Sequence, residues 1–182
     1  MWPAIVGPKN PTAESRLRAV ATAHVLPSEP TLRRAEQRDL DGLVRLEQRC
    51  FDLDRLSRRS LWRFLRQARA SLLVAERPAG GGLAGYALVT LRRGARVARL
   101  YALAVDPSER RRGLGRRLLR AAEAAASSAG AAELRLEVRA DNREAISAYE
   151  ADGYRPIGRY PAYYEDGAEA LRFAKPLPAP KV

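Results

Sequence analysis

The fold is decided by residues 98–126, which read ARLYALAVDPSERRRGLGRRLLRAAEAAA. The first part is an apolar run that ends at Asp106 and predicts a strand at about Val97–Val105. The last part, residues 116–126, carries apolar residues on one broad helical face. Between them lies a turn of arginine and glycine, residues 110–115. The stretch therefore predicts a strand, a turn and a helix in succession.

The turn predicts a phosphate-binding site made of backbone. The first N–H groups of a helix have no partner within the helix, and the helix dipole adds to their attraction for an anion. Gly113 and Gly115 let an anion approach the backbone closely and allow a positive φ. Many loops contain arginine and glycine, so the turn alone is weak evidence for a phosphate site. The strand before it and the helix after it strengthen the prediction.

Composition confines the chain to one class of protein. Its 182 residues, 46% of them hydrophobic, predict a single soluble domain with a proper core. No apolar run approaches the ~20 residues of a membrane span, and the N-terminus lacks the pattern of a signal peptide. One cysteine, Cys50, and one histidine, His24, leave almost no ligands for disulfides, zinc or Ser/His catalysis. These features predict a cytoplasmic protein with no metal and no membrane association.

The formal net charge is +12, and nearly all the cations are arginine. A field of this sign attracts anionic ligands, RNA or a ribosomal surface. A general bias toward arginine and alanine explains the charge equally well, because the arginines are scattered along the whole chain. Charge alone therefore identifies no partner.

The order of the predicted elements implies an α/β fold. Residues 1–30 contain several prolines and predict a tail or irregular arm, with a short helix around Ser15–Val20. Residues 31–182 form the predicted domain. Its elements are strands at 31–35, 71–76, 83–91, 97–105, 133–138, 155–159 and 168–174, and helices at 40–50, from about 57, from 116 to about 130, and at 142–152. This order predicts a mixed sheet whose central strand–helix–strand unit is parallel and right-handed.

A second set of motifs follows the turn. After Val105-Asp106-Pro107 and Arg110-x-x-Gly113-x-Gly115 come Leu136-Glu137-Val138-Arg139, then Asn142-x-x-Ala145-x-x-x-Tyr149-Glu150 and Gly153-Tyr154. With these residues, the stretch 31–176 resembles the GNAT superfamily of acyl-CoA-dependent N-acetyltransferases. Within that superfamily it is most similar to the bacterial ribosomal-protein alanine acetyltransferases. The combination is far more specific than any one motif.

The resemblance implies a GNAT-like mixed central sheet with a splayed parallel strand pair and flanking helices. The strands that end near Val105 and Val138 would form the split, and acetyl-CoA would be the co-substrate. Its pantetheine would pair with the backbone of Leu103, Ala104 and Val105. The remaining cofactor-binding residues would be Arg110, Arg111, Arg112, Gly113, Leu114, Gly115, Arg116 and Asn142, with the pyrophosphate on the backbone amides of the turn. Asn142 also has a simpler role as a helix N-cap, and both roles are compatible.

Two residues are the candidates for the chemistry. Acetyl transfer to an amine needs a deprotonated amine, a polarised carbonyl and a proton for the departing thiolate. The resemblance makes Glu137 the general base, directly or through water, and Tyr149 the acid that protonates the CoA sulfur. Strand alternation also allows an ion-paired ladder of Arg135, Glu137 and Arg139. Helical spacing likewise allows Tyr149 to be a core residue beside Ile146.

The acceptor is the least determined part. In relatives the loop at 160–167 covers the acceptor amine, which makes Tyr163 and Tyr164 the substrate-binding candidates, although tyrosine-rich loops are also common without function. The leading hypothesis is an enzyme that acetylates the α-amine of a protein or peptide, with a ribosomal protein as the plausible acceptor. Two alternatives stay open: an acetyltransferase for a small-molecule amine, and a non-catalytic acyl-CoA-sensing module that binds RNA or the ribosome. Nucleic acid is not expected as a substrate, because the arginine turn has no interleaved aromatic residues.

Overall fold

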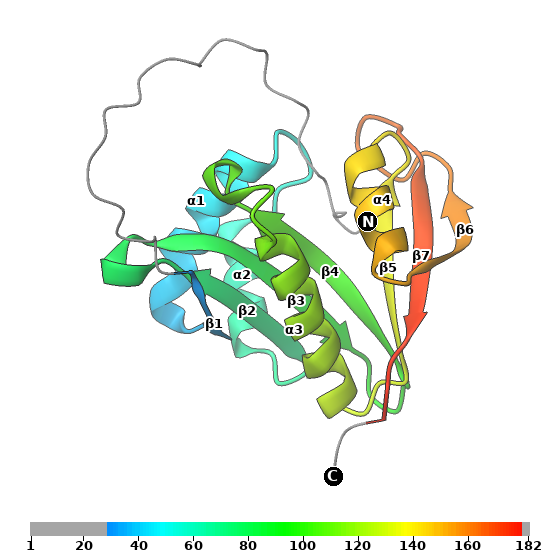
Figure 1. The fold of residues 1–182 in the computed structure, drawn as a ribbon, viewed down its shortest axis with the longest axis horizontal. Helices are drawn as coiled ribbons and strands as arrows, with labels where there is room; N and C mark the ends of the chain where they lie inside the picture. Colours follow the sequence, from blue (N-terminus) through cyan, green and yellow to red (C-terminus); the bar gives the residue numbers. More distant parts are fainter. Residues whose placement is uncertain (1–28, 180–182) are drawn as a thin grey trace.

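One mixed sheet organises the structure. The computed structural model describes residues 29–179, in which seven strands form a sheet of order β1-β2-β3-β4-β5-β7-β6 (Figure 1). The strands are β1 (Thr31–Arg34), β2 (Ala70–Glu76), β3 (Leu83–Leu91), β4 (Val97–Val105), β5 (Glu133–Arg139), β6 (Arg155–Tyr160) and β7 (Ala170–Pro176). The α-helices are α1 (Leu40–Cys50), α2 (Arg58–Arg66), α3 (Leu114–Ser128) and α4 (Arg143–Ala151). Within these residues, no helix combines the length and the apolar character needed to cross a bilayer.

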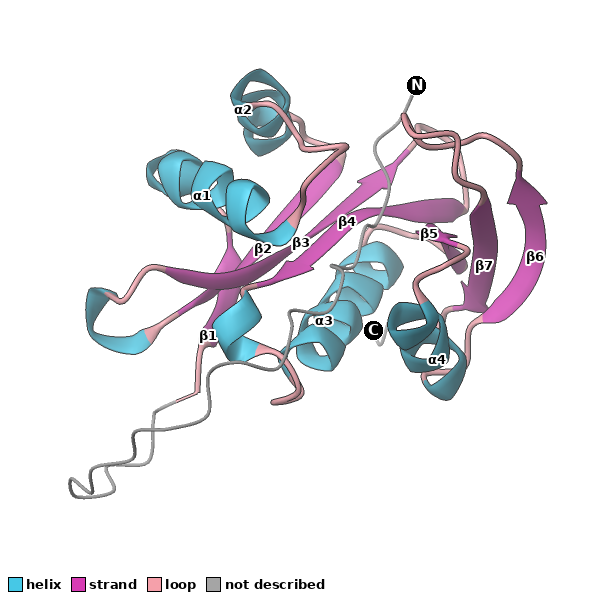
Figure 2. Cartoon of the chain, turned by 90° about the horizontal axis from the view of Figure 1, so that it is seen from above, coloured by secondary structure: helices cyan, strands magenta, loops and turns pink. Residues whose placement is uncertain are grey.

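Helices cover both faces of the sheet. Figure 2 shows α1 and α2 on one face and α3 and α4 on the other. Leu43 and Leu46 of α1 and Leu61 of α2 are fully buried on the first face, and Leu118 of α3 is fully buried on the second. Each such leucine contributes about 1.5–3 kcal/mol by leaving water. Because both of its faces are covered, β3 is buried without interruption from residue 83 to 89.

The helix after the turn begins earlier than its periodicity predicts. α3 starts at Leu114 rather than at Arg116. Gly113 adopts the left-handed conformation, with φ 79°, and its carbonyl accepts the first helical hydrogen bond from Arg117 N–H (3.1 Å). The predicted glycine of the turn is therefore the N-cap of the helix, which a pattern of apolar residues does not reveal.

The last strand begins later than predicted, at Ala170 rather than at 168. The N–H of Ala168 donates to the Asp166 carboxylate (3.1 Å), and its carbonyl accepts from Tyr163 N–H (2.9 Å). Both groups are thus used inside the loop and are lost to the sheet. The order of all other predicted elements is confirmed, and β3 and β4 have the predicted bounds. The helix predicted at Ser15–Val20 lies outside the described residues.

β4 and β5 are the parallel pair, and they diverge from a short base. Their register covers only Val97–Arg99 against Glu133–Arg135. β5 stays paired with β7 along its full length, and β4 stays paired with β3. The β5-facing edge of β4 from Leu100 to Val105 therefore has no strand partner, and the two strands separate toward their C-terminal ends (Figure 1). The predicted splayed pair is confirmed.

Candidate active site

Alternation decides which backbone groups of β4 face the split. Asp106, just beyond the end of β4, donates its N–H to the carbonyl of Ala84 in β3 (2.8 Å). Along an antiparallel strand, the N–H and C=O groups of every second residue point to the same neighbour. Ala104, two residues before Asp106, therefore also directs its backbone groups at β3. Leu103 and Val105 consequently direct theirs toward the split. Of the three residues predicted to pair with an extended ligand, Leu103 directs its N–H and carbonyl to the split and Ala104 faces β3. Val105 directs its N–H to the split, but its carbonyl already accepts from Arg110 and Cys50.

The carbonyl of Val105, at the end of β4, forms hydrogen bonds with two side chains from other segments. This oxygen accepts from Arg110 Nε and from Cys50 Sγ, each at 3.4 Å. Burial raises the pKa of the Cys50 thiol to about 11, so the thiol keeps the proton it donates. Gly85 of β3 lies opposite Val105, and a Cβ at Gly85 would come within 2.6 Å of the Ala104 carbonyl oxygen. Only glycine therefore lets β3 approach β4 this closely at the mouth of the split.

The buried carboxylate of Asp106 shapes the first half of the turn. It accepts from Ser108 N–H (3.0 Å) and forms ion pairs with Arg49 and with Arg77 (3.4 Å). Burial alone would raise the pKa of Asp106, but the hydrogen bonds from Ser108 and the two guanidinium charges lower it overall. The aspartate of the Asp-Pro motif thus stays charged and ties the turn to α1.

The second half of the turn holds a row of unused backbone donors. Arg111 and Gly113 both have positive φ, 59° and 79°, which turns the chain sharply into α3. In the described part of the chain, no carbonyl or side chain accepts a hydrogen bond from the N–H groups of residues 111–116. A concave run of N–H groups at a helix N-terminus binds phosphate oxygens. The N–H groups predicted to bind pyrophosphate are therefore without an acceptor among the described residues.

The two glycines of the turn have different reasons to be glycine. Gly113 needs a positive φ that side chains rarely adopt. Gly115 has no such φ, and a Cβ there would make only ordinary contact with Val105 Cγ2 (3.6 Å). The protein itself would therefore accept a Cβ at position 115, so neither backbone conformation nor packing within the protein requires glycine there.

Asn142 stands where β5 passes into α4. Its Oδ1 accepts from Ala145 N–H (3.2 Å), which is the predicted N-cap contact. Its Nδ2 is buried and has no partner among the described residues. A buried donor without a partner costs about 1–3 kcal/mol. The side chain thus caps the helix through Oδ1, while its Nδ2 has no partner among the described residues.

Tyr149 is buried on α4, with its ring edge-on to Tyr154 at a centroid distance of 5.7 Å. Burial raises the pKa of Tyr149 well above its ordinary value. The phenol is therefore protonated at neutral pH, which is the state a general acid requires. The ring also belongs to the core cluster under α3, so Tyr149 packs in the core, and this packing leaves the acid role as a prediction.

Glu137 is a buried carboxylate between two guanidinium groups. Arg99 Nη2 of β4 lies 2.7 Å from one oxygen, and Arg172 Nε of β7 lies 3.8 Å from the other. The alternative, a ladder of Arg135, Glu137 and Arg139 within β5, does not form, since Arg135 pairs with Glu133 and Arg139 pairs with Asp141 and Asp166. Glu137 is thus ion-paired across the strands, at the base of the split.

The tyrosine loop joins this charge network through Tyr163. Arg99 Nη2 donates to the Tyr163 hydroxyl (2.6 Å), so one arginine links the loop to Glu137. Tyr163 also stacks on Tyr160 at a centroid distance of 5.6 Å. Tyr164 is buried under the Arg139 guanidinium (4.8 Å), and burial raises its pKa. The structure therefore brings Tyr163 toward the site, whereas Tyr164 packs the loop onto the sheet.

Sequence reasoning missed a buried carboxylate, Glu47 of α1. It accepts from Leu56 N–H (2.5 Å) and from the Tyr86 hydroxyl, and burial raises its pKa to about 7. Tyr101, whose pKa burial raises to about 12, lies close to Glu47 and Tyr86. A charged residue inside the apolar stripe of a helix, between Leu43 and Cys50, was the signal available in the sequence. Glu47 holds the loop between α1 and α2 against the sheet beside the split.

Comparison with known proteins accounts for this arrangement. A family model described as the acetyltransferase (GNAT) family matches residues 40–154, more than half of the chain. The chain belongs to the GNAT family. The diverging strands, the row of turn amides and the residues around them are thus placed in a GNAT fold, as the motifs predict. Among the described residues, no group of three His, Cys, Asp or Glu side chains could hold a metal ion.

Individual relatives of this GNAT protein match parts of the chain. An uncharacterised protein from Mycobacterium leprae is 44% identical over 72 residues, which are 39% of this chain and 19% of that protein. A ribosomal protein bS18-alanine N-acetyltransferase from Escherichia coli is 42% identical over 83 residues, or 44% of this chain and 56% of the relative. The chain thus spans about half the length of that curated enzyme and a fifth of the M. leprae protein.

A solved structure extends the match over the whole fold. The crystal structure of the ribosomal-protein-S18-alanine N-acetyltransferase from E. coli superposes with a TM-score of 0.73 at 30% identity. The match covers 83% of this chain and 96% of that chain. The resemblance to GNAT acetyltransferases stated from the motifs is confirmed.

Proposed function

We propose that this protein transfers the acetyl group of acetyl-CoA to the α-amine of a protein acceptor. The observation that carries the proposal is the row of unbonded N–H groups at 111–116, next to the open edge of β4. Coenzyme A joins a diphosphate to a long arm that contains amides. The diphosphate fits the turn, and the arm fits the edge at Leu103 and Val105 as an added strand. When bound, acetyl-CoA supplies the activated acetyl thioester.

Several side chains complete the proposed cofactor site. The guanidinium of Arg110 is held at the Val105 carbonyl (3.4 Å), and its buried Nη2 has no partner in the described chain. The buried Nδ2 of Asn142 is a second unused donor, at the start of α4. Both donors match the anionic and carbonyl oxygens of a coenzyme. Arg116 forms an ion pair with Asp152 (2.7 Å), so its contribution is proposed to come from its backbone N–H.

In the proposed reaction the acceptor nitrogen forms a bond to the acetyl carbon, and the carbon–sulfur bond breaks. Tyr149 gives its phenolic proton to the departing thiolate, and burial, which raises the pKa of Tyr149, keeps the phenol protonated until then. Glu137 receives the proton of the attacking amine, directly or through water. Its ion pairs with Arg99 and Arg172 fix the carboxylate and link it to Tyr163. Tyr163 is accordingly proposed to contact the acceptor.

The choice of a protein α-amine rests on the relatives. The curated E. coli relative and the solved structure are both named as alanine N-acetyltransferases of a ribosomal protein. A ribosomal acceptor and a cytoplasmic location are proposed for this chain on the same ground. A small-molecule amine is the second candidate. A non-catalytic acyl-CoA sensor is less well supported, because it would have no need of both Glu137 and Tyr149.

Mass spectrometry of a mixed acceptor panel tests the proposal. The protein and acetyl-CoA are incubated with alanine-first peptides, with α-blocked peptides that contain lysine, and with small amines. Acetylation confined to the free α-amines is the expected result. Products from small amines alone would replace the proposal with the second candidate.

Two controls show whether an absence of product reflects an unsuitable acceptor or an absence of catalysis. Acetyl-CoA binding is measured by calorimetry on the same preparation. Binding without any product would refute catalysis on these acceptor classes and favour the sensor. The Tyr149→Phe variant distinguishes enzymatic product from spontaneous acetylation, because it leaves the cofactor site intact.

A further inference from the structure

A strongly basic surface lies away from the turn at residues 110–116, where the diphosphate of acetyl-CoA is proposed to bind. We call this turn the cofactor turn. Residues 55–75 and 77–105 contain no aspartate or glutamate, although they hold many of the chain's arginines. The structure brings together the end of α2, the segment after it and the hairpin between β3 and β4. We define the arginine face by the residues that these three segments expose: Trp62, Arg63, Arg66, Arg69, Arg92, Arg93 and Arg96.

The charge of the arginine face is uncompensated. Throughout residues 29–179, none of its six arginines forms an ion pair, whereas arginines elsewhere, such as Arg77 and Arg139, do. One acidic residue, Glu133, lies next to the face through its backbone: its N–H donates to the Arg96 carbonyl (3.3 Å). Its carboxylate is already paired with Arg135. Exposed like charges repel one another, and an anionic partner would offset this repulsion, so the electrostatics of the face favour binding an anion.

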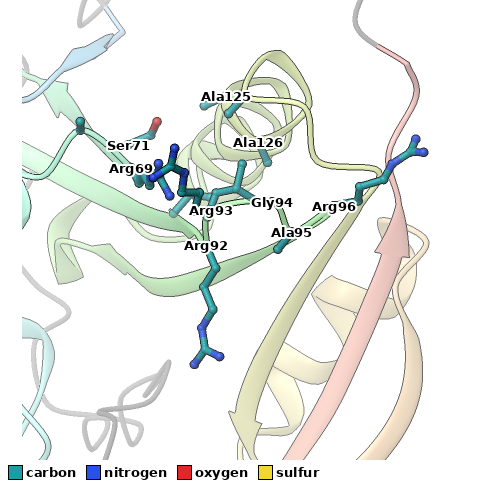
Figure 3. A pocket seen from close by; sticks show the side chains of 13 residues that line it. Arg69, Ser71, Arg92, Arg93, Gly94, Ala95, Arg96, Ala125 and Ala126 are labelled. Carbon is teal, nitrogen blue, oxygen red and sulfur yellow. The ribbon is translucent and has the colours of Figure 1, made fainter.

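The face is hollowed rather than flat. Two adjoining hollows of about 500 and 930 Å³ share Arg69, Leu91, Arg92 and Arg93 in their walls. Figure 3 shows Arg69 and Arg93 side by side near Ser71, below the end of α3, with Arg92 and Arg96 extending in other directions. Guanidinium groups that point in several directions around a hollow suit a partner with many phosphates along a bent chain.

An aromatic platform stands at the edge of the hollows. Trp62 is 44% exposed, and the Arg66 guanidinium lies over its ring at 4.6 Å. Exposed aromatic and guanidinium planes are the surfaces on which unpaired bases stack. A lipid membrane would need several apolar side chains, and among residues 29–179 Trp62 is the one large, exposed apolar residue that lines these hollows. Phosphates with flat bases match the face better than lipid headgroups do.

We propose that the arginine face binds single-stranded or looped RNA. Arg69, Arg92 and Arg93 contact its phosphates, and Trp62 with Arg66 stacks on a base. From Arg96 to Val105 the chain runs along β4 for about 30 Å, so RNA at the hairpin leaves the cofactor turn free. The face would therefore hold the enzyme near an RNA-containing assembly while the turn at residues 110–116 stays free for acetyl-CoA. This inference does not depend on the proposed reaction.

Fluorescence anisotropy with a fluorescein-labelled oligouridine of about 12 nucleotides tests the proposal in the full chain. The charge-reversal variant is Arg69→Glu/Arg92→Glu/Arg93→Glu. Its matched control is Arg34→Glu/Arg45→Glu/Arg155→Glu, which changes the net charge equally at three exposed arginines that form no ion pair among the described residues. Unchanged acetyl-CoA binding shows that each variant is folded, and Arg→Gln versions replace any that is not.

The face variant should lose at least tenfold in RNA affinity, and the control less than threefold. Each phosphate contact with single-stranded RNA adds about 0.7 to the salt dependence, so the slope of log Kd against log salt should fall by about 2. Trp62→Ala should weaken binding about tenfold, as expected for one stacked base. Equal losses in the face variant and its control would overturn the proposal. Face-dependent binding to vesicles that contain phosphatidylserine, without RNA binding, would overturn it in favour of a membrane.

Discussion

A glutamate at position 115 should separate the stability of this protein from its ability to bind acetyl-CoA. Gly115 is the second residue of α3, and its Cβ position is in ordinary contact only with Val105. A carboxylate in the first turn of a helix stabilises the fold by about 0.3–1 kcal/mol through the helix dipole. Replacing a helical glycine adds about 0.5–1 kcal/mol more. The Gly115→Glu variant should therefore melt at the wild-type temperature or a few degrees above it.

The same carboxylate faces the proposed diphosphate site. Two unit charges about 4 Å apart repel each other by about 1 kcal/mol in bulk water and about 4 kcal/mol near a protein surface. The turn is partly exposed, so we expect a loss of about 2–4 kcal/mol in binding, or roughly 30- to 1,000-fold in Kd. Gly115→Gln is the matched control, because it has nearly the same volume and no charge.

Calorimetric titration of acetyl-CoA into the three proteins measures the effect. Gly115→Gln reports the steric cost, and the further loss in Gly115→Glu reports the charge. Added salt should narrow the gap between the two variants, because it screens exposed charges. Equal affinities for Gly115→Glu and Gly115→Gln would refute the placement of a diphosphate at this turn.

Three further predictions concern buried side chains. Tyr149→Phe should lower kcat at least ~100-fold with little change in acetyl-CoA affinity, and steady-state kinetics with a near-normal kcat would exclude the acid role. Glu137→Gln should lower kcat with little change in acetyl-CoA affinity, whereas Arg99→Gln, which keeps the carboxylate, should lower kcat less. Equal losses of kcat in the two variants would mean that Glu137 only positions Arg99 and Tyr163. The pKa of Glu47 is raised from 4.5 to about 7 in the folded state, which corresponds to roughly 3 kcal/mol. The folded protein then binds the proton more tightly than the unfolded chain, so stability should fall as pH rises from about 4.5 to about 7. The melting temperature of the wild type should fall with rising pH more steeply than that of Glu47→Gln. Parallel plots of melting temperature against pH would contradict the burial of a titrating carboxyl.

The sequence by itself determined the local structure. Alternating and helical apolar patterns depend on neighbours a few residues apart, so β3 and β4 have the predicted bounds. Ser57 and Asn142 accept the hydrogen bonds of their helices' first turns, because capping is also local. The glycine turn at the start of α3 belongs to the same class. Its unused amides follow from a helix N-terminus and need no distant residue.

Only the tertiary structure decided which side chains meet. The pairing of Glu137 with Arg99 and Arg172 depends on the order β4-β5-β7, which no pattern within β5 contains. The divergence of β4 from β5 is likewise a property of two strands together. Glu47 became buried because the segment around Leu56 folds over it, and the scattered arginines became one face because α2 and the β3–β4 hairpin meet. Charges gathered from distant segments are set by packing and register, and the sequence pattern of any one segment does not contain that information.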